Sequence, residues 1–283
     1  MDLSIVILNY KTARLTRQCV KTVKLYEPKC SHEIIVVDNE SGDGVGEMLR
    51  ENFPDVKFVA SGANLGYAAG NNLGIRRSAG RYVLILNPDI TVRPGSIDAM
   101  VAYLDAHDDV GMIGPRLVRP DGGVDESCYR FPGYMIPAYR RTPLGKLAAG
   151  RRALDHYLMT DYDRSVTREV DWLLGAVLMV RRSALLKVGF FDERYFLYFE
   201  DTDWCRRFWQ AGYRVVYFTG AEMVHYHERL SARGSWFTSL FRKSTRVHIA
   251  SALKYFRKWR LVQRLGPPDG PDTDTVWPPP SKR

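Results

Sequence analysis

Short apolar runs recur along the first 114 residues of the chain, and most of them end in polar residues. The runs span residues 3–8, 34–37, 56–60, 82–86 and 110–114. Between them, apolar residues recur at helical spacing near 12–26, 44–52, 68–78 and 96–105. Continuous apolar runs of this length are typical of strands that are buried on both faces of a parallel sheet. The alternation predicts an α/β fold with right-handed βαβ units, in which helices flank a mostly parallel, Rossmann-like central sheet.

The second half of the chain is less regular. Residues 119–170 are rich in Gly, Pro, Arg and Tyr and show little periodicity, which predicts long loops over a binding face. Regular patterns return as a strand at 177–180, helices at 182–188 and 201–211, and a strand at 214–218. Aromatic and basic residues then alternate over 236–262, as in an amphipathic helix.

The composition restricts the chemical class of the binding partners but does not distinguish between folds. The 283 residues carry a formal net charge of +9, so we expect an anionic partner such as a phosphorylated substrate, anionic lipid or nucleic acid. The cysteines are scattered, with no Cys-x-x-Cys pair: Cys19, Cys30, Cys128 and Cys205. Zinc and disulfide frameworks are therefore not expected, and reduced thiols suit the cytoplasm. No apolar run reaches the roughly 20 residues that a membrane-spanning helix needs.

Three of the predicted strands end in residues that suit a binding site. Asn9 and Tyr10 follow the first, Asp38 and Asn39 follow the second, and residues 87–89 (Asn-Pro-Asp) follow the fourth. Ligands of open parallel sheets bind beyond the carboxyl ends of the strands, so these residues are expected to face one crevice. A single aspartate at such a place commonly forms only a turn or a helix cap. Two aspartates on one edge favour a site.

A glycine-rich stretch, residues 64–72, lies between the third strand and its helix. Gly66 and Gly70 would let the backbone approach a ligand closely, and amides at a helix start favour phosphate or hydroxyl oxygens. The stretch lacks the Gly-x-Gly-x-x-Gly spacing of dinucleotide-binding proteins and the Gly-Lys-Ser/Thr of a P-loop. Oxidoreductase and kinase functions are therefore disfavoured.

Three acids in four residues, at 200–203, separate an aromatic run from a predicted helix. Acids at a helix start commonly only interact with the helix dipole. An acid beside so apolar a run is also where a raised pKa, and hence a general base, is expected. Further along, His225 follows a predicted strand; a lone histidine is more often structural, but near Asp89 it would suit a metal site.

Seven segments together resemble one enzyme family. They are Val-Ile-Leu-Asn-Tyr (6–10), Ile-Val-Val-Asp-Asn-Glu-Ser-Gly-Asp-Gly (35–44), Asn-Leu-Gly-Tyr-Ala-Ala-Gly-Asn-Asn (64–72), Leu-Asn-Pro-Asp (86–89), Trp-Leu-Leu-Gly-Ala (172–176), residues 191–207 and the region around His225. In this order they resemble the family-two inverting glycosyltransferases of GT-A fold. They are most similar to the rhamnosyltransferase-like branch that builds bacterial cell-surface polysaccharides.

The resemblance implies a reaction and roles for residues. One sugar would pass from a nucleoside-diphosphate sugar, with dTDP-L-rhamnose favoured, to a hydroxyl of a glycan or of a polyprenyl-diphosphate-linked saccharide. Asp38 would bind the base of the donor, and Asp201 would be the catalytic base with Glu200 and Asp203 as supporting acids. The donor and acceptor pocket would further include Asn9, Tyr10, Asn39, Asn64, Gly66, Gly70, Asn71, Asn87, Trp172 and Gly175.

A divalent cation is also implied by the resemblance. Asp89 stands for the metal-binding acid of the family's Asp-x-Asp motif, Asn87 replaces the first acid, and His225 would complete the site. Mg²⁺ or Mn²⁺ suits such an oxygen-rich site better than zinc does. The cation would neutralise charge on the leaving diphosphate while Asp201 accepts the proton of the acceptor hydroxyl.

The resemblance divides the chain into three parts. Residues 1–228 would form the GT-A catalytic domain, with a nucleotide-binding half at 1–115 and an acceptor-binding and catalytic-base half at 116–228. A basic amphipathic helical region at 229–265 and a disordered tail at 266–283, rich in Pro, Asp and Thr, would follow.

Two other functions compete with this one. A nucleotidyltransferase that makes sugar nucleotides would carry a glycine-rich basic loop after the first strand, whereas residues 9–12 hold no glycine. A non-catalytic nucleic-acid-binding domain would use the positive charge with stacking aromatics. The acids of the predicted crevice would repel phosphate unless a metal were bound, so a glycosyltransferase is favoured and no nucleic-acid partner is expected.

The helix predicted at 236–262 indicates where in the cell the protein is expected. Its cations exclude insertion across a bilayer, but an amphipathic helix can lie on an anionic leaflet with its aromatic residues in the interface. The alternative is that its apolar side packs on the catalytic domain. The sequence favours a cytoplasmic enzyme that associates peripherally with the inner face of the plasma membrane through anionic lipid.

Overall fold

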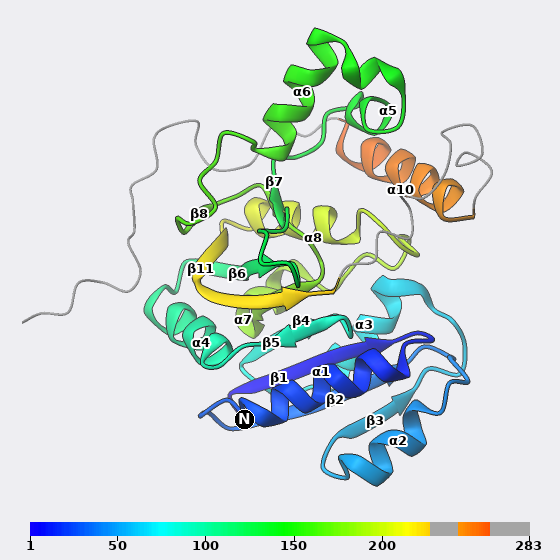
Figure 1. The fold of residues 1–283 in the computed structure, drawn as a ribbon, viewed down its shortest axis with the longest axis vertical. Helices are drawn as coiled ribbons and strands as arrows, with labels where there is room; N and C mark the ends of the chain where they lie inside the picture. The colour runs from blue at the N-terminus through cyan, green and yellow to red at the C-terminus, as the bar shows by residue number, and fades with distance from the viewer. Residues whose placement is uncertain (227–242, 261–283) are drawn as a thin grey trace, which may run out of the picture.

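The computed structural model describes residues 1–226 and 243–260, with side chains of the second range from Thr245 onward. Within this part of the chain, nine strands join in one sheet and two more form a small ribbon, β7 (Cys128–Tyr129) with β9 (Trp172–Leu173) (Figure 1). The sheet strands are β1 (Leu3–Asn9), β2 (His32–Asp38), β3 (Lys57–Ala60), β4 (Tyr82–Leu86), β5 (Ile90–Val92), β6 (Val110–Val118), β8 (Arg168–Glu169), β10 (Val177–Arg181) and β11 (Arg214–His225).

The sheet is mostly parallel, as the sequence predicts. Its order is β3-β2-β1-β4-β10-β6-β11-β5, with β8 paired to β11. Strands β1 to β4 run parallel to their neighbours in that group, and β6 runs parallel to β11. β10 is inserted antiparallel between β4 and β6, and β5 and β8 are antiparallel to β11. The carboxyl ends of β1, β2 and β4 therefore meet at one edge, where the predicted donor residues lie.

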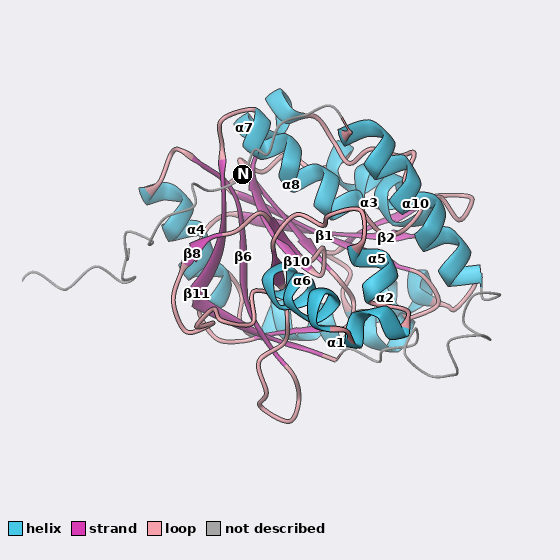
Figure 2. Ribbon diagram, turned by 90° about the horizontal axis from the view of Figure 1, so that it is seen from above, coloured by secondary structure: helices cyan, strands magenta, loops and turns pink. Residues whose placement is uncertain are grey.

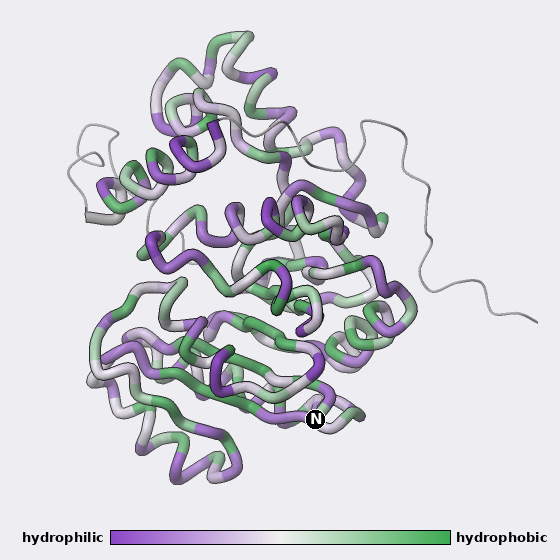
Figure 3. Tube along the Cα trace, turned by 180° about the vertical axis from the view of Figure 1, so that it is seen from behind, coloured by the Kyte–Doolittle hydropathy of each residue, from purple (hydrophilic) through white to green (hydrophobic). Residues whose placement is uncertain are grey.

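Helices cover both faces of the sheet (Figure 2). They are α1 (Ala13–Leu25), α2 (Val45–Asn52), α3 (Gly66–Arg76), α4 (Ser96–Ala106), α5 (Ile136–Tyr139), the 3-10 helix η1 (Pro143–Lys146), α6 (Ala148–Leu158), α7 (Arg182–Val188), α8 (Glu200–Gln210) and α10 (Lys243–Trp259). Side chains of α1, α2 and α4 share one core with one face of the strands, and those of α3, α7 and α8 share another. In β1, for example, Ile5 belongs to the first core and Val6 to the second. Burial on both faces explains why these strands are apolar throughout (Figure 3).

Three predictions for the second half need correction. Residues 119–170 are not loops alone, because α6 forms a helix there; it buries only Gly150 and Tyr157, so its sequence lacks a strong apolar period. β6 continues through Pro115, which lies opposite Phe218 next to an irregularity in the pairing with β11. β11 extends to His225, which therefore ends a strand instead of following one at a distance.

The predicted C-terminal helix is present over Lys243–Trp259. The remainder of the predicted span, including Trp236, Phe237, Leu240 and Phe241, lies outside the described residues, as does the tail at 266–283. Tyr255 and Trp259 are buried against Tyr195 and Phe199, in the segment that precedes α8. For this part of the helix the aromatic side packs on the protein, and the expectation that it faces a membrane is wrong. Of the helices in the described part, none is long and apolar enough to cross a membrane.

Candidate active site

Asn9 supports the end of β1 and does not open into the crevice. Its side chain is fully buried and donates to Asp38 Oδ1 over 3.0 Å and to the Ser41 hydroxyl over 2.9 Å. Its own oxygen accepts from the hydroxyls of Thr12 and Thr16. These contacts occupy the amide with protein groups and fix Asp38, so Asn9 would serve the predicted donor site through Asp38.

Asn39 has a similar supporting place. Its buried amide donates to Asn64 Oδ1 over 3.1 Å and to the Gly66 carbonyl over 3.2 Å, and its oxygen accepts from the Leu65 amide over 2.9 Å. Asn39 thus holds the glycine-rich stretch against the end of β2. Among the predicted site residues that follow β1 and β2, Asp38 is half-buried and Tyr10 is 42% exposed.

The two glycines expected near a ligand are instead approached by protein atoms. Gly66 has φ +81°, and a Cβ there would lie 2.3 Å from the Phe196 carbonyl oxygen. The Tyr67 amide donates to that same carbonyl over 2.7 Å. At Gly70 a Cβ would lie 2.7 Å from a methyl carbon of Leu8. Small residues are required here so that α3 can pack on β1 and on the segment before α8.

Tyr67, which is not among the residues predicted for the site, lies between the end of β4 and the loop after β9. Its hydroxyl is 3.1 Å from Asn87 Oδ1 and 2.5 Å from the Gly175 carbonyl oxygen. Burial raises the pKa of Tyr67 well above its ordinary value, and the charges of Glu200, Asp201 and Asp89 raise it further. The hydroxyl therefore stays protonated and donates to one of these oxygens, so it links the end of β4 to the loop after β9.

Asp89 and His225 lie together, as the resemblance implies. His225 Nε2 is 3.5 Å from Asp89 Oδ2, and the Tyr226 amide donates to the Asp89 carbonyl over 2.9 Å. Asp89 Oδ1 is buried and has no hydrogen-bond partner among the described residues. Two ligands of one cation, each about 2.1 Å from it, are no more than about 4 Å apart. Asp89 Oδ2 and His225 Nε2 lie within this separation, and the unpartnered Oδ1 leaves the same carboxylate a second oxygen, so the pair fits a divalent cation.

Asp125 contacts the other nitrogen of the His225 ring, and even with it the described residues hold no group of three or more His, Cys, Asp or Glu side chains placed to bind a metal. Its Oδ2 is 2.8 Å from His225 Nδ1, in a contact between buried side chains. Burial disfavours the charged imidazole, but the hydrogen bonds to Asp125 and Asp89 outweigh it and raise the pKa of His225 to about 9. Asp125 lies 100 positions before His225 in a loop without periodicity, so no sequence signal links the two.

Glu200 and Asp201 begin α8, and both are buried. Asp201 Oδ2 accepts from the Gly175 amide over 3.0 Å, and Oδ1 accepts from the Thr202 amide over 2.7 Å. Glu200 Oε2 is buried without a hydrogen-bond partner in the described ranges. Burial raises the pKa of Glu200 well above its ordinary value, with a further rise from the charge of Asp201, and burial also raises the pKa of Asp201. The hydrogen bonds from Gly175 and Thr202 offset part of that rise and keep Asp201 the more acidic of the two.

The backbone directly before these acids is strained. Tyr198 and Phe199 have φ of 70° and 69°, and neither is glycine. A left-handed conformation costs on the order of 1–2 kcal/mol for each such residue. Surrounding contacts must therefore hold this turn.

Asp203 does not join Glu200 and Asp201 in the crevice. Its fully buried carboxylate contacts Arg207 of α8 and Lys258 and Trp259 of α10. Its oxygens are taken up by the contact with α10, so its role as a supporting acid, which stays a prediction, would be indirect.

Trp172 and Asn71 are buried close to the crevice. The Trp172 ring stacks on Tyr129 with centroids 4.5 Å apart, and its N–H donates to the Arg130 carbonyl over 2.9 Å. Asn71 donates to the Tyr67 carbonyl over 3.0 Å, and its oxygen has no hydrogen-bond partner among the described residues. Asn71 thus keeps an unused acceptor in the interior beside Tyr67.

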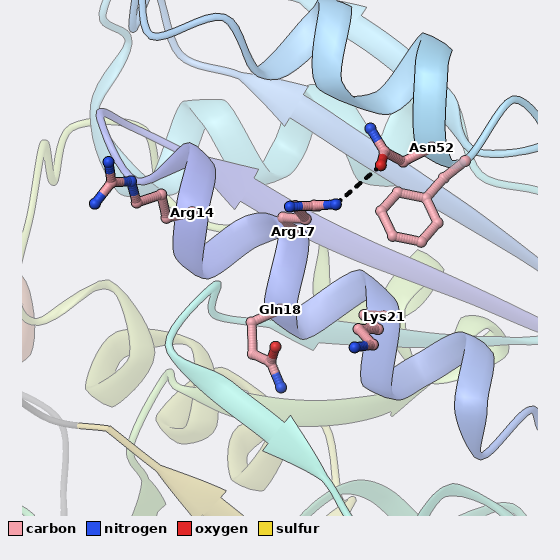
Figure 4. Close-up of a pocket in the computed structure, with 6 residues that line it drawn as sticks. Arg14, Arg17, Gln18, Lys21 and Asn52 are labelled. Atoms are coloured by element: carbon pink, nitrogen blue, oxygen red, sulfur yellow. Dashed lines mark hydrogen bonds between the residues drawn. The ribbon is translucent and has the colours of Figure 1, made fainter.

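A separate groove lies between α1 and α2 (Figure 4). It is lined by Arg14, Arg17, Gln18, Lys21, Asn52 and Phe53, and Arg17 donates to Asn52 Oδ1 over 3.0 Å. It shares no residue with the crevice described above, so we do not assign the crevice chemistry to it.

A family model matches much of the chain. The model described as glycosyl transferase family 2 matches residues 4–170, more than half of the chain. The chain belongs to glycosyltransferase family 2. Among relatives of this glycosyltransferase, an N-acetylglucosaminyl-diphospho-decaprenol L-rhamnosyltransferase from Mycobacterium tuberculosis is 34% identical over 82% of this chain and 78% of its own. The rhamnosyltransferase WbbL from Escherichia coli is 25% identical over 82% of this chain and 84% of its own.

Solved structures share the fold of this glycosyltransferase. A mannosyltransferase from Pyrobaculum calidifontis, in complex with GDP-Man and Mn²⁺, matches with a TM-score of 0.56 and 17% identity over 93% of this chain and 76% of that one. GalNAc-T7 with UDP, GalNAc and Mn²⁺ matches with a TM-score of 0.62 and 15% identity over 85% of this chain and 47% of that one. At these identities the likeness shows a GT-A fold.

Proposed function

We propose that this glycosyltransferase moves one sugar, with inversion at the anomeric carbon, from a nucleoside-diphosphate sugar to an acceptor hydroxyl. One observation carries the proposal. Asp89 at the end of β4 and Asp201 at the start of α8 both face Tyr67, which contacts Asn87 and Gly175. An acid that would hold a cation and an acid that would accept a proton are thus both close enough to the Tyr67 hydroxyl to raise its pKa. Direct displacement needs these two functions and no protein nucleophile.

The favoured donor is dTDP-L-rhamnose, and the favoured acceptor is a saccharide on a polyprenyl diphosphate. The support is the name of the Mycobacterium relative, together with the dTDP-rhamnosyl transferase RfbF from Shigella flexneri, which is 26% identical over 71% of this chain and 62% of its own. Asp38, held by Asn9, has the exposure needed to accept hydrogen bonds from the donor base, and Tyr10 lies beside it.

Asp89 and His225 would hold Mg²⁺ or Mn²⁺ in this proposal. A divalent cation at this place supplies charge neutralisation for the diphosphate that leaves. Asp125 accepts the hydrogen bond of His225 Nδ1–H and so orients the ring with Nε2 toward Asp89, where a cation would replace the Nε2 proton. Phosphate oxygens of the donor and water would supply the remaining ligands, as is usual for these ions.

Asp201 is the proposed base. The Gly175 and Thr202 amides orient its carboxylate and keep it ionised more readily than Glu200. As the acceptor oxygen attacks the anomeric carbon from the face opposite the diphosphate, Asp201 takes its proton. Glu200, whose pKa is raised well above its ordinary value, stays neutral beside it and adds no second charge.

A transfer screen tests the function. Purified protein is incubated with a panel of nucleotide sugars, with manganese or magnesium, and with a short-chain N-acetylglucosaminyl-diphospho-prenol. We expect transfer from dTDP-L-rhamnose that stops in chelator and returns with the metal. Absence of transfer from every nucleotide sugar in the panel would contradict the proposal.

Peripheral association with an anionic membrane is part of the proposal, but through the exposed side of α10. Exposed side chains recur at helical spacing along α10 and at the residue after it. They are Arg246, Ile249, Leu253, Arg257 and Arg260, and Leu253 is 67% exposed. Apolar side chains flanked by cations suit the interface of an anionic leaflet. We expect co-sedimentation with vesicles that contain anionic phospholipid, release by salt, and loss on combined Leu253→Ser and Arg257→Ser substitution. Equal binding to neutral and anionic vesicles, or binding to neither, would refute it.

A further inference from the structure

One face of α10 is hydrogen-bonded along the segment that leads into the catalytic acids. The Ser251 hydroxyl donates to the Leu197 carbonyl over 2.9 Å, and Lys254 Nζ donates to the Arg194 carbonyl over 2.6 Å. One turn further, Lys258 Nζ is 2.9 Å from Asp192 Oδ2. These contacts follow residues 192–197 in order, so α10 lies along this segment and is held to its backbone at more than one point.

The same face then reaches α8 itself. Lys258 Nζ lies 2.7 Å from Asp203 Oδ1, and Trp259 Nε1 donates to that oxygen over 2.9 Å. Arg207 Nε donates to the other oxygen of Asp203 over 2.9 Å. Asp203 is fully buried and lies two residues after Asp201 in the first turn of α8. A buried carboxylate keeps its place only while its cations and donors are present, so its position depends on α10.

Aromatic packing adds a third contact at the strained turn. The Phe199 ring lies 5.2 Å from the rings of both Tyr255 and His248, between centroids. Phe199 is one of the two left-handed residues that precede Glu200. Because its conformation is disfavoured, the turn would relax without the ring contacts that α10 supplies. Relaxation there would move the start of α8, where Asp201 lies.

We propose that α10 positions the catalytic base, with Lys258 and Trp259 as positioning residues that act through Asp203. This inference rests on the proposed role of Asp201. Within the described residues, the side-chain hydrogen bonds of α10 reach segment 192–203, Arg206 and Arg141, and do not reach Asp38, Asp89 or His225. Loss of these contacts should therefore impair turnover and spare the binding of the nucleotide.

Two variants remove the contacts with little change of shape. Trp259→Phe keeps an aromatic ring but lacks the N–H, and Lys258→Met keeps the length but lacks the charge. Lys258→Arg restores a cation and serves as the rescue, and Arg50→Met, which removes an exposed cation from α2, is the matched control. Assays use dTDP-L-rhamnose and the short-chain prenyl acceptor without vesicles, together with calorimetry of thymidine diphosphate with Mn²⁺.

We expect kcat to fall about 10-fold to 100-fold in Trp259→Phe and Lys258→Met, because small displacements of a catalytic group carry penalties of this size. The affinity for thymidine diphosphate and the KM for the donor should stay within about two-fold of the wild type. Lys258→Arg and Arg50→Met should remain near the wild type. Unchanged kcat in both test variants, or kcat and nucleotide affinity falling together, would overturn the proposal.

Hydrogen exchange gives a readout that needs no turnover. In Lys258→Met and Trp259→Phe, amides of residues 197–203 should exchange faster than in the wild type, while those of β1 and β4 should not. Unchanged exchange at 197–203 would overturn the positioning role even if transfer had not been observed. If Asp201→Asn stays active while exchange accelerates, the assignment of the base fails and the effect of α10 on this turn stands.

Discussion

Asp201 and Glu200 are neighbours in the chain but differ in what holds their carboxylates. Asp201 accepts two amide hydrogen bonds, whereas Glu200 has an unpartnered buried oxygen. Asp201→Asn cannot accept a proton and should lower kcat by about 100-fold or more. Glu200→Gln resembles the protonated acid and should lower kcat much less than Asp201→Asn does. Steady-state kinetics of the two variants compares them directly, and the reverse order of losses would assign the base to Glu200.

Glu200 also predicts how stability depends on pH. Burial raises the pKa of Glu200 in the folded protein above its ordinary value of 4.5, so above that pH the unfolded chain binds fewer protons than the folded one. The free energy of unfolding must then fall as the pH rises from the pKa of Glu200 in the unfolded chain to its pKa in the folded protein. Glu200→Gln removes this decline, so its stability relative to the wild type should improve from pH 5 to pH 8. If the difference in the free energy of unfolding between Glu200→Gln and the wild type is the same at pH 5 and pH 8, the pKa of Glu200 is not raised.

Asp125 should affect metal affinity without being a ligand itself. Asp125→Asn keeps the size of the side chain but weakens the hydrogen bond that fixes His225, and losses of about 10-fold to 100-fold in metal affinity are usual for such partners. Calorimetry of Mn²⁺ in the presence of thymidine diphosphate measures this change. Asp121→Asn, at an exposed position of the same loop, is the control. Equal Mn²⁺ affinity in the wild type and Asp125→Asn would exclude the role.

At the scale of elements, the junction between α3 and the segment before α8 should be sensitive to one added methyl group. Gly66 combines φ +81° with a Cβ position 2.3 Å from the Phe196 carbonyl oxygen, whereas Gly62 has φ +73° and open space. Gly66→Ala should therefore destabilise the protein by about 2–4 kcal/mol, and Gly62→Ala by about 1 kcal/mol from backbone strain alone. Denaturant unfolding measures both. Equal losses would mean that the close contact is not present.

The elements of the first half are predictable from sequence because β1, β2 and β4 are buried on both faces and are each followed by polar residues. This pattern places Asp38 and Asp89 at one edge without any tertiary information. α6 is not predictable in the same way, since little of it is buried. Nor is the antiparallel β10, because a short apolar run carries no signal of its direction.

At the scale of the whole molecule, some residues of the site could not be predicted from the sequence. They are brought into the site by contacts between segments that are distant in the chain. Asp125 meets His225 across 100 positions, and Tyr67 meets Gly175 across 108. Asp203 shares a motif with Asp201 yet points to α10, because alternate residues at a helix start face different neighbours. A motif predicts which residues gather, but packing decides which of them reach the crevice.

The measurement that tests the account most directly is NMR of the product of transfer from dTDP-L-rhamnose with Mn²⁺, made beside Asp89→Ala and a chelated sample. The account predicts a product whose anomeric configuration is opposite to that of the donor, and no product either in chelator or with folded Asp89→Ala. A product with the donor's configuration, or full activity in chelator, would contradict it.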